Sequence, residues 1–239
     1  MKFHIYHSTE ELLYAYALYF IQQANDYIAS QGCFNIVLSG GSSPKRVYEI
    51  LASPVLSGQL DWTKVNFFFG DERHVPADDA RNNALMVEKA LFKPLHIAPS
   101  QVFKINTSLK PKASAQDYGE VVSSFFKGKP IRFDLILLGL GDNAHTASLF
   151  PYTPILHEES ATVSEVYLKE EDAYRISMSA PMINQAKHVA FLVFGKNKAT
   201  ALEQVINGER NPEKYPAQLI RLKTGEVHWF LDGEAAAGL

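Results

Sequence analysis

The chain has 239 residues, which is enough for one large α/β domain or two small ones. Hydrophobic residues make up 46% of it and charged residues 21%, so a disordered chain is excluded and a globular protein with a buried core is expected. The formal net charge is -3 and no stripe of lysine and arginine stands out, which argues against a nucleic-acid partner.

The first part of the chain predicts a long helix. Ser8 is followed three residues later by Glu11, the pattern of a capping box at a helix N-terminus. Apolar residues then recur at helical spacing up to Ile28, and Gly32 is placed to end the helix in the left-handed conformation.

Short apolar strands and helices alternate along the rest of the chain. Strands are expected at residues 35–39, 65–69, 133–138, 174–179, 188–194 and 226–231, and helices at 44–51, 82–91 and 198–206, the first of these with Pro44 at its first position. Strands that are apolar on both faces and separated by helices predict an α/β fold, with a mostly parallel sheet covered by helices on both faces. The polar connection 104–115 is expected to be a surface loop. Because no linker or repeat interrupts the pattern, residues 1–239 are expected to form a single domain.

In such sheets ligands bind outside the carboxyl ends of the strands, so the residues that follow each strand are the candidates for function. The segment SGGSSP (39–44) follows the first strand. Gly40 and Gly41 free the backbone, Ser42 and Ser43 supply hydroxyls, and a helix begins, which together make a site suited to a phosphate. An ordinary tight turn with serine caps is the alternative. A Walker A loop is excluded, because no Gly-Lys-Ser/Thr closes the segment.

The second strand is followed by GDERHVP (70–76), which places Asp71, Arg73 and His74 at one strand end. A carboxylate there can orient a histidine, and an arginine can meet an oxyanion. A solvated loop is the alternative, and His74 is the residue best explained by packing or surface exposure.

The third strand is followed by GLGDNAHTASLFP (139–151). Its glycines formally fit a dinucleotide fingerprint, but Pro151 would stop the required helix within about two turns. His145 is better explained as a reactive group, because an imidazole has an unperturbed pKa of about 6.5 and takes a proton from water near neutral pH. We expect a helix N-terminus there to favour the neutral imidazole; a simple helix cap is the alternative.

Two cations belong to the same set of strand ends. Arg175 lies in or at the start of a predicted strand, where a cation in apolar surroundings needs an anionic partner. Lys198 stands at the opening of a predicted helix, where the helix dipole does not favour it unless it faces an anion. Surface salt bridges are the alternative for both.

Other features of the sequence bear on the cellular location of the protein and on its need for a cofactor. The single cysteine, Cys33, excludes an internal disulfide and fits a reducing compartment, and we expect neither a signal peptide nor a membrane span. A cytoplasmic protein is therefore expected. The protein is also expected to be a monomer or a weak homo-oligomer. No zinc or calcium motif is present, so no metal or other cofactor is expected, and no Gly-x-Ser-x-Gly elbow supports a serine hydrolase.

Taken together, these segments resemble the 6-phosphogluconolactonase family, which is related to the glucosamine-6-phosphate deaminases. The matching pieces are SGGSSP (39–44), GDERHVP (70–76), the Asn82-Asn83 helix start, GLGDNAHTASLFP (139–151), YRISMSAP (174–181), FGKNKA (194–199), PAQLIR (216–221) and HWFLDGEAA (228–236). They span nearly the whole chain in the right order, and HTASLFP is the most specific of them.

The resemblance implies a Rossmann-like α/β fold and metal-free hydrolysis of a δ-lactone that carries a 6-phosphate, namely 6-phosphogluconolactone. By the same resemblance His145 is similar to the family's water-activating base, and Asp71 and Arg73 are similar to the acid and the arginine of its second motif. The loop Gly41–Ser43, Arg175 and Lys198 resemble the phosphate-binding set.

One departure from the family pattern bears on the choice of activity. The usual Asp-Gly before the histidine is Asn143-Ala144 here, and alanine disfavours the positive φ that glycine allows. In the deaminases that acid, and a glutamate five residues after the histidine, take part in ring opening; here the positions hold Asn143 and Phe150. The lactonase is therefore expected, with an amino-sugar phosphate deaminase or a non-catalytic sugar-phosphate sensor as the alternatives.

Overall fold

The computed structural model describes all residues from Met1 to Leu239 and contains a parallel sheet and a smaller antiparallel sheet. The large sheet has the strand order β1-β9-β8-β5-β2-β3, and every neighbouring pair is parallel. Its strands are β1 (Lys2–Tyr6), β2 (Phe34–Leu38), β3 (Val65–Phe69), β5 (Leu135–Gly139), β8 (His188–Val193) and β9 (Glu226–Asp232). The expected mostly parallel α/β fold is confirmed.

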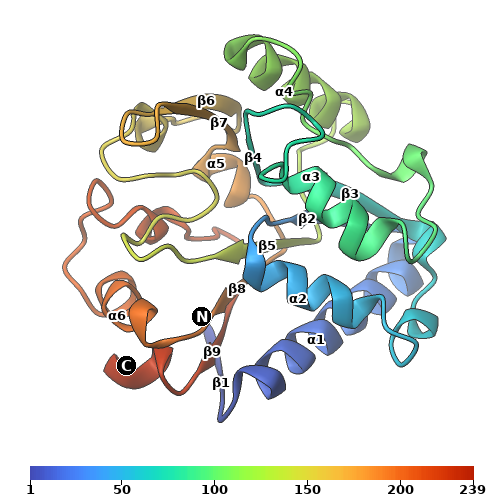
Figure 1. The fold of residues 1–239 in the computed structure, drawn as a ribbon, viewed down its shortest axis with the longest axis horizontal. Coiled ribbons are helices and arrows are strands. Elements are labelled where there is room, and N and C mark those ends of the chain that lie inside the picture. Colours follow the sequence, from blue (N-terminus) through green and yellow to red (C-terminus); the bar gives the residue numbers. More distant parts are fainter.

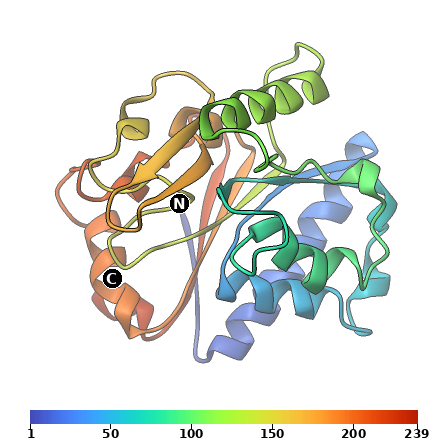
Figure 2. The same cartoon turned by 45° about the horizontal axis from the view of Figure 1, so that its top comes forward.

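Helices cover the large sheet on both sides, as Figures 1 and 2 show. The helices α1 (Thr9–Gln31), α2 (Ser42–Leu51) and α3 (Asn83–Val87) lie on one side, and α4 (Pro111–Phe126), α5 (Ala180–Ile183) and α6 (Ala199–Ile206) lie on the other with the small sheet. Sixty-three buried apolar residues form one continuous cluster, which supports our proposal of a single domain. None of the helices combines the length and the apolar character needed to cross a bilayer.

The small sheet joins two of the crossover connections. It has the order β4-β7-β6 and is antiparallel, with β4 (Asp71–Arg73), β6 (Val163–Leu168) and β7 (Ala173–Met178). The strand β4 comes from the connection between β3 and β5, whereas β6 and β7 come from the connection between β5 and β8. This pairing brings the segment after β3 next to the segment that carries Arg175.

The strand order also shows where a ligand is expected. The chain moves from β2 outward to β3 on one side, and from β5 outward to β8 and β9 on the other. Connections therefore reverse direction between the neighbouring strands β2 and β5, and such a switch point opens a crevice at the carboxyl ends of the strands. The segments that follow these two strands are the serine-glycine turn and the loop of His145.

Most predicted elements are present with small shifts of their ends. Ser8 caps α1 by accepting a hydrogen bond from the Glu11 N–H at 3.2 Å, and Gly32 ends it with φ of 85°. The helix α2 begins at Ser42, so Pro44 is its third residue instead of its first; proline is tolerated there because N–H groups of the first turn have no partner within the helix.

Several elements depart from the sequence-based expectations. The helix α4 occupies the second part of the expected loop 104–115, with Pro111 as its first residue, and β1, β4 and β6 were not expected. The strand at 174–179 belongs to the small antiparallel sheet. Finally, the expected helix after the third strand does not form: residues 140–150 make turns and one short bridge between Thr146 and Leu149.

Candidate active site

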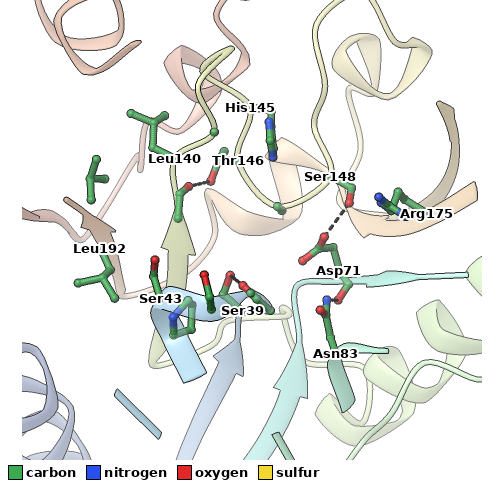
Figure 3. A pocket seen from close by; sticks show the side chains of 18 of the residues that line it. Ser39, Ser43, Asp71, Asn83, Leu140, His145, Thr146, Ser148, Arg175 and Leu192 are labelled. Carbon is green, nitrogen blue, oxygen red and sulfur yellow. Dashed lines mark hydrogen bonds between the residues drawn. The ribbon is translucent and has the colours of Figure 1, made fainter. Parts of the chain in front are cut away.

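A cleft of about 370 Å³ opens at the carboxyl ends of β2 and β5. Nine of the ten residues singled out in the sequence line it: Gly40, Gly41, Ser42, Ser43, Asp71, Arg73, His145, Arg175 and Lys198. Asn143, the tenth, lies behind the imidazole of His145 and lines a neighbouring hollow. Figure 3 shows the serine-glycine turn on one side of the cleft and the loop of His145 on the other. His74 lies outside this cleft, and its ring contacts the Leu109 carbonyl at 2.8 Å.

The serine-glycine turn presents free N–H groups to the cleft. Gly41 caps α2 with φ of 107° and provides no side chain, and the N–H groups of Gly41, Ser42 and Ser43 donate no hydrogen bond within the protein. Free N–H groups at a helix N-terminus, together with the helix dipole, form an anion site. The buried Tyr48 fixes the start of the turn, because its hydroxyl donates to the Ser39 carbonyl at 2.8 Å and accepts from the Ser39 N–H at 3.1 Å.

A close contact explains why Gly40 is a glycine. A Cβ at this position would lie 1.8 Å from Oδ1 of Asn83. The Asn83 side chain is held there because its Nδ2 donates to the Asp71 carbonyl at 3.0 Å and its backbone N–H donates to Glu72 at 2.6 Å. Burial raises the pKa of Glu72 to about 7, against the effect of the N–H groups that its carboxylate accepts. Sequence reasoning missed this role of Glu72, because the residue contacts only backbone groups.

The loop of His145 is tight and carries two strained residues. Ala144 has φ of 60° and Ala147 has φ of 46°, so both adopt the left-handed conformation that favours glycine. The Gly141 N–H donates to the His145 carbonyl at 2.8 Å, and the Thr146 hydroxyl donates to the Gly139 carbonyl at 2.8 Å. These bonds hold the loop although no helix forms, and the positive φ angles explain why it cannot be helical.

Asn143 determines the tautomer of His145. Its Oδ1 accepts a hydrogen bond from the backbone N–H of His145 at 3.2 Å and lies 2.6 Å from Nδ1 of the same residue. Because a backbone N–H is always a donor, the atom that receives it is the amide oxygen, and Nδ1 must therefore carry the proton. The other ring nitrogen, Nε2, is left with a free lone pair.

The surroundings of His145 keep it neutral. Its ring stacks on Phe150 with 4.1 Å between the centroids. Burial and, second to it, the charge of Lys198 lower the pKa of His145 to about 4; Arg175 and Arg73 act in the same direction, and Asp142 opposes them. The neutral imidazole thus follows from burial and cations, not from the helix N-terminus that the sequence led us to expect.

Asp71 does not contact the imidazole. Its carboxylate is buried and accepts a hydrogen bond from the Ser148 hydroxyl at 2.6 Å, as Figure 3 shows. Burial raises the pKa of Asp71, while the bond from Ser148 and the charges of Arg73 and Arg175 oppose that rise. Ser148, which sequence reasoning did not select, thereby links the loop of His145 to β4.

Three cations border the cleft. Arg73 and Arg175 stand opposite one another in the pairing of β4 and β7, and Lys198 lies just before α6. Arg175 forms an ion pair with Glu171, and Lys198 forms one with Asp142. The Arg73 guanidinium donates to the Arg81 carbonyl at 2.9 Å. The cleft therefore combines positive charge with free N–H groups and one neutral imidazole.

Comparison with known proteins places this geometry in a family. The family model for glucosamine-6-phosphate isomerases and 6-phosphogluconolactonases matches residues 7–229. The chain belongs to this family.

Relatives that match most of the chain agree with the family model. The 6-phosphogluconolactonase of Synechocystis is 38% identical over 219 residues, covering 89% of this chain and 87% of that protein. The enzyme of Haemophilus influenzae is 34% identical and covers 84% and 85%. The structure of the Trypanosoma cruzi 6-phosphogluconolactonase superimposes with a TM-score of 0.88 at 27% identity, over 100% of this chain and 96% of that one.

Proposed function

We propose that the protein hydrolyses 6-phosphoglucono-1,5-lactone to 6-phosphogluconate, with His145 as the general base. The observation that carries the proposal is the single cleft that holds a free Nε2 of His145 opposite the free N–H groups of the Gly41–Ser43 turn. The named lactonases that match most of the chain support the same activity. This lactone has an anionic phosphate at one end and an electrophilic carbonyl at the other. The N–H groups of the turn can bind the phosphate, and Nε2 of His145 can activate a water molecule that attacks the carbonyl.

The phosphate orients the substrate in this proposal. It binds the N–H groups of the Gly41–Ser43 turn together with Arg175 and Lys198, which exchange their carboxylate partners Glu171 and Asp142 for the phosphate oxygens. Charge-assisted hydrogen bonds of this kind are about twice as strong as neutral ones. Fixing the phosphate holds the lactone carbonyl beside His145, and such positioning contributes up to ~7–11 kcal/mol to lowering a barrier in favourable cases.

The proton then moves through one nitrogen. Nε2 of His145 takes a proton from a water molecule as its oxygen attacks the lactone carbonyl carbon, and Asn143 accepts from Nδ1 throughout. We assign the developing oxyanion to Arg73, whose guanidinium lines the cleft. The N–H groups of Gly141 and Ala144 already donate within the loop. When the carbon–ring-oxygen bond breaks, the ring oxygen receives the proton back from Nε2. Asp71 positions Ser148 and the strand that carries Arg73.

Substrate binding also strengthens the base. In the free protein Lys198 and Arg175 help to lower the pKa of His145 to about 4, where an imidazole is a weak base. A bound phosphate neutralises part of that positive charge, so the pKa of His145 rises toward neutrality once the substrate is in place. The same anion therefore positions the lactone and activates the group that attacks it.

The related deaminase activity is not favoured. Deamination with ring opening needs acids near the histidine, and the two positions carry Asn143 and Phe150, whose ring stacks on the imidazole. The test is a direct comparison of substrates. The lactone is generated in situ and its disappearance followed, and glucosamine 6-phosphate is supplied separately with ammonia as the readout. Accelerated lactone loss without ammonia supports the proposal; ammonia release with lactone loss no faster than in buffer would overturn it.

A further inference from the structure

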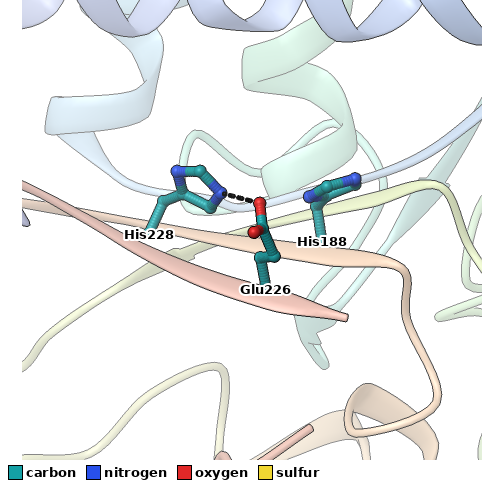
Figure 4. Close-up of side chains that lie close together, drawn as sticks. All are labelled: His188, Glu226 and His228. Carbon is teal, nitrogen blue, oxygen red and sulfur yellow. Dashed lines mark hydrogen bonds and ion pairs between the residues drawn. The ribbon is translucent and has the colours of Figure 1, made fainter. Parts of the chain in front are cut away.

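A second cluster of ionisable side chains lies at the opposite end of the large sheet. His188 is the first residue of β8 and Glu226 is the first residue of β9, and the two are direct partners in the parallel pairing. His228 follows two residues after Glu226, so it projects from the same face of the sheet. Figure 4 shows the two imidazoles on either side of the carboxylate. The cleft of His145 is at the carboxyl ends of the strands, so the two sites are distinct.

We propose that His188, Glu226 and His228 form a binding site for a divalent late transition metal ion, with Zn²⁺ as the best fit. One ligand atom from each residue lies within 4.8 Å of the others. Two imidazoles and one carboxylate form a typical protein ligand set for Zn²⁺, and they leave a fourth position for water. The proposal is independent of the lactonase activity, and it departs from the expectation of no metal that the sequence motifs gave.

The distances are close to those that a bound ion requires. Nε2 of His228 lies 3.2 Å from Oε2 of Glu226. In a tetrahedral site with ligand distances of about 2.0–2.1 Å, neighbouring ligand atoms are about 3.3 Å apart. The distance between the ligand atoms of His228 and Glu226 therefore already fits a bound ion. Only the distance from His188 to these two atoms has to shorten.

Hydrogen bonding alone leaves part of the cluster without partners. It accounts for His228, whose Nε2 contacts Glu226 and whose Nδ1 lies 3.0 Å from Nε2 of His4. Nδ1 of His188 and the hydroxyl of Tyr19, whose ring lies 4.8 Å from that of His228, are buried without any hydrogen-bond partner. Buried polar groups are nearly always paired, so an unpaired imidazole nitrogen beside a carboxylate calls for an additional ligand.

The surroundings allow the ion to enter with little rearrangement. When a metal binds Nε2 of His228, the proton of that ring moves to Nδ1 and the proton of His4 moves from its Nε2 to its Nδ1. Nδ1 of His228 then donates to Nε2 of His4, and a hydrogen bond of this kind orients metal-bound histidines. The competing cation is Lys2, which pairs with Glu226 at 2.7 Å and is half exposed, so it can swing into solvent.

Metal titration of the full-length protein, freed of any affinity tag, tests the proposal. Zn²⁺ is titrated by calorimetry, and Co²⁺ is used as a probe because four-coordinate Co²⁺ absorbs strongly in the visible range. We expect one equivalent of Zn²⁺ per chain, a higher Tm with the metal, and an affinity lowered at least about tenfold by His188→Gln and by Glu226→Gln. Both replaced side chains are partly exposed, so the variants should fold, which circular dichroism checks.

Two matched variants decide where the ion binds. His157→Gln removes an exposed histidine far from the cluster in the sequence, and His145→Ala removes the imidazole of the cleft. Both should bind Zn²⁺ like the parent protein. Failure of the parent to bind one equivalent, equal affinity in His188→Gln and His157→Gln, or loss of binding in His145→Ala would each overturn the proposal.

Discussion

Arg73 and Arg175 stand directly opposite one another in the antiparallel pairing of β4 and β7, and both side chains line the cleft. Like charges in directly opposed positions destabilise a sheet. The arrangement is therefore favourable chiefly when an anion lies between or beside the two guanidinium groups, and this relationship ties the small sheet to the recognition of a charged substrate.

Replacement of Arg175 by alanine should mainly weaken substrate binding. A hydrogen bond to a charged group contributes about 1.5–3 kcal/mol, so KM should rise about 10- to 100-fold while kcat changes much less. Steady-state kinetics on freshly generated lactone measure both constants. Arg132→Ala is the matched control, because that guanidinium bonds only to the exposed Thr224. An unchanged KM in Arg175→Ala would remove the residue from the phosphate site.

Two glycines near the start of the His145 loop allow a matched comparison: Gly139, the last residue of β5, and Gly141 in the loop. A Cβ added at Gly141 would lie 2.1 Å from Nδ1 of His145, whereas a Cβ at Gly139 would meet nothing within 4 Å. Gly141→Ala should therefore displace the imidazole and lower kcat by about 100-fold, since misplacement by about 1 Å can cost that much. Gly139→Ala should behave like the parent. Equal kcat values for the two variants would contradict the position assigned to the imidazole.

Substitutions of Asn143 separate orientation from charge. Asn143→Ala removes the acceptor that fixes Nδ1–H, so kcat should fall by roughly 10²–10⁴-fold, the usual contribution of general-base catalysis. Asn143→Asp keeps an acceptor and adds a negative charge, which stabilises the imidazolium and raises the pKa of His145. The aspartate variant should thus retain activity near pH 8. As the pH is lowered, its activity should begin to fall at a higher pH than that of the parent. An unchanged kcat in Asn143→Ala would show that Asn143 has no role in setting the tautomer.

In the parent protein, kcat/KM and kcat should depend differently on pH, because kcat/KM reports the pKa of His145 in the free protein and kcat reports it in the substrate complex. Activity needs the neutral imidazole, so kcat/KM should rise with pH through the pKa of about 4 and level off above it. The midpoint for kcat should lie higher, because the bound phosphate raises the pKa of His145. In Lys198→Gln a cation that lowers this pKa is absent, so the midpoint of kcat/KM should shift upward. An unchanged midpoint in that variant would show that Lys198 does not act on the imidazole.

The free energy of unfolding should also depend on the protonation of buried histidines. His145 and His228 have folded-state pKa values near 4, below the unfolded value of about 6.5, so the unfolded chain binds more protons between these limits. Their contribution to stability is fully present above pH 6.5 and is lost as the pH falls toward 4.

The sequence predicts the architecture and the composition of the cleft well because both depend on local signals. Apolar strands such as Val65–Phe69 and the capping residues Ser8 and Gly32 can be identified from patterns of a few neighbouring residues. The parallel topology brings together the polar segments that follow β2, β3, β5 and β8, and the antiparallel pairing of β4 with β7 adds Arg175, so that nine selected residues line one cleft.

Features that depend on distant pairing could not be predicted in this way. The strands β4 and β6 exist because two separate connections meet, and neither has a distinctive pattern of its own. The bond between Ser148 and Asp71 joins residues that are 77 positions apart. The prediction of a helix after the third strand was wrong because Ala144 and Ala147 adopt positive φ. Alanine rarely adopts this conformation, so the sequence gives no indication of it.

The most direct test of the account is the rate of lactone disappearance with the His145→Ala variant, followed by nuclear magnetic resonance immediately after the lactone is generated. We expect kcat to fall at least about 100-fold at pH 7, while binding of 6-phosphogluconate, which depends on the Gly41–Ser43 turn and Arg175, is retained. Hydrolysis by the correctly folded variant at the rate of the parent would contradict the claim that the neutral imidazole of residue 145 activates the attacking water.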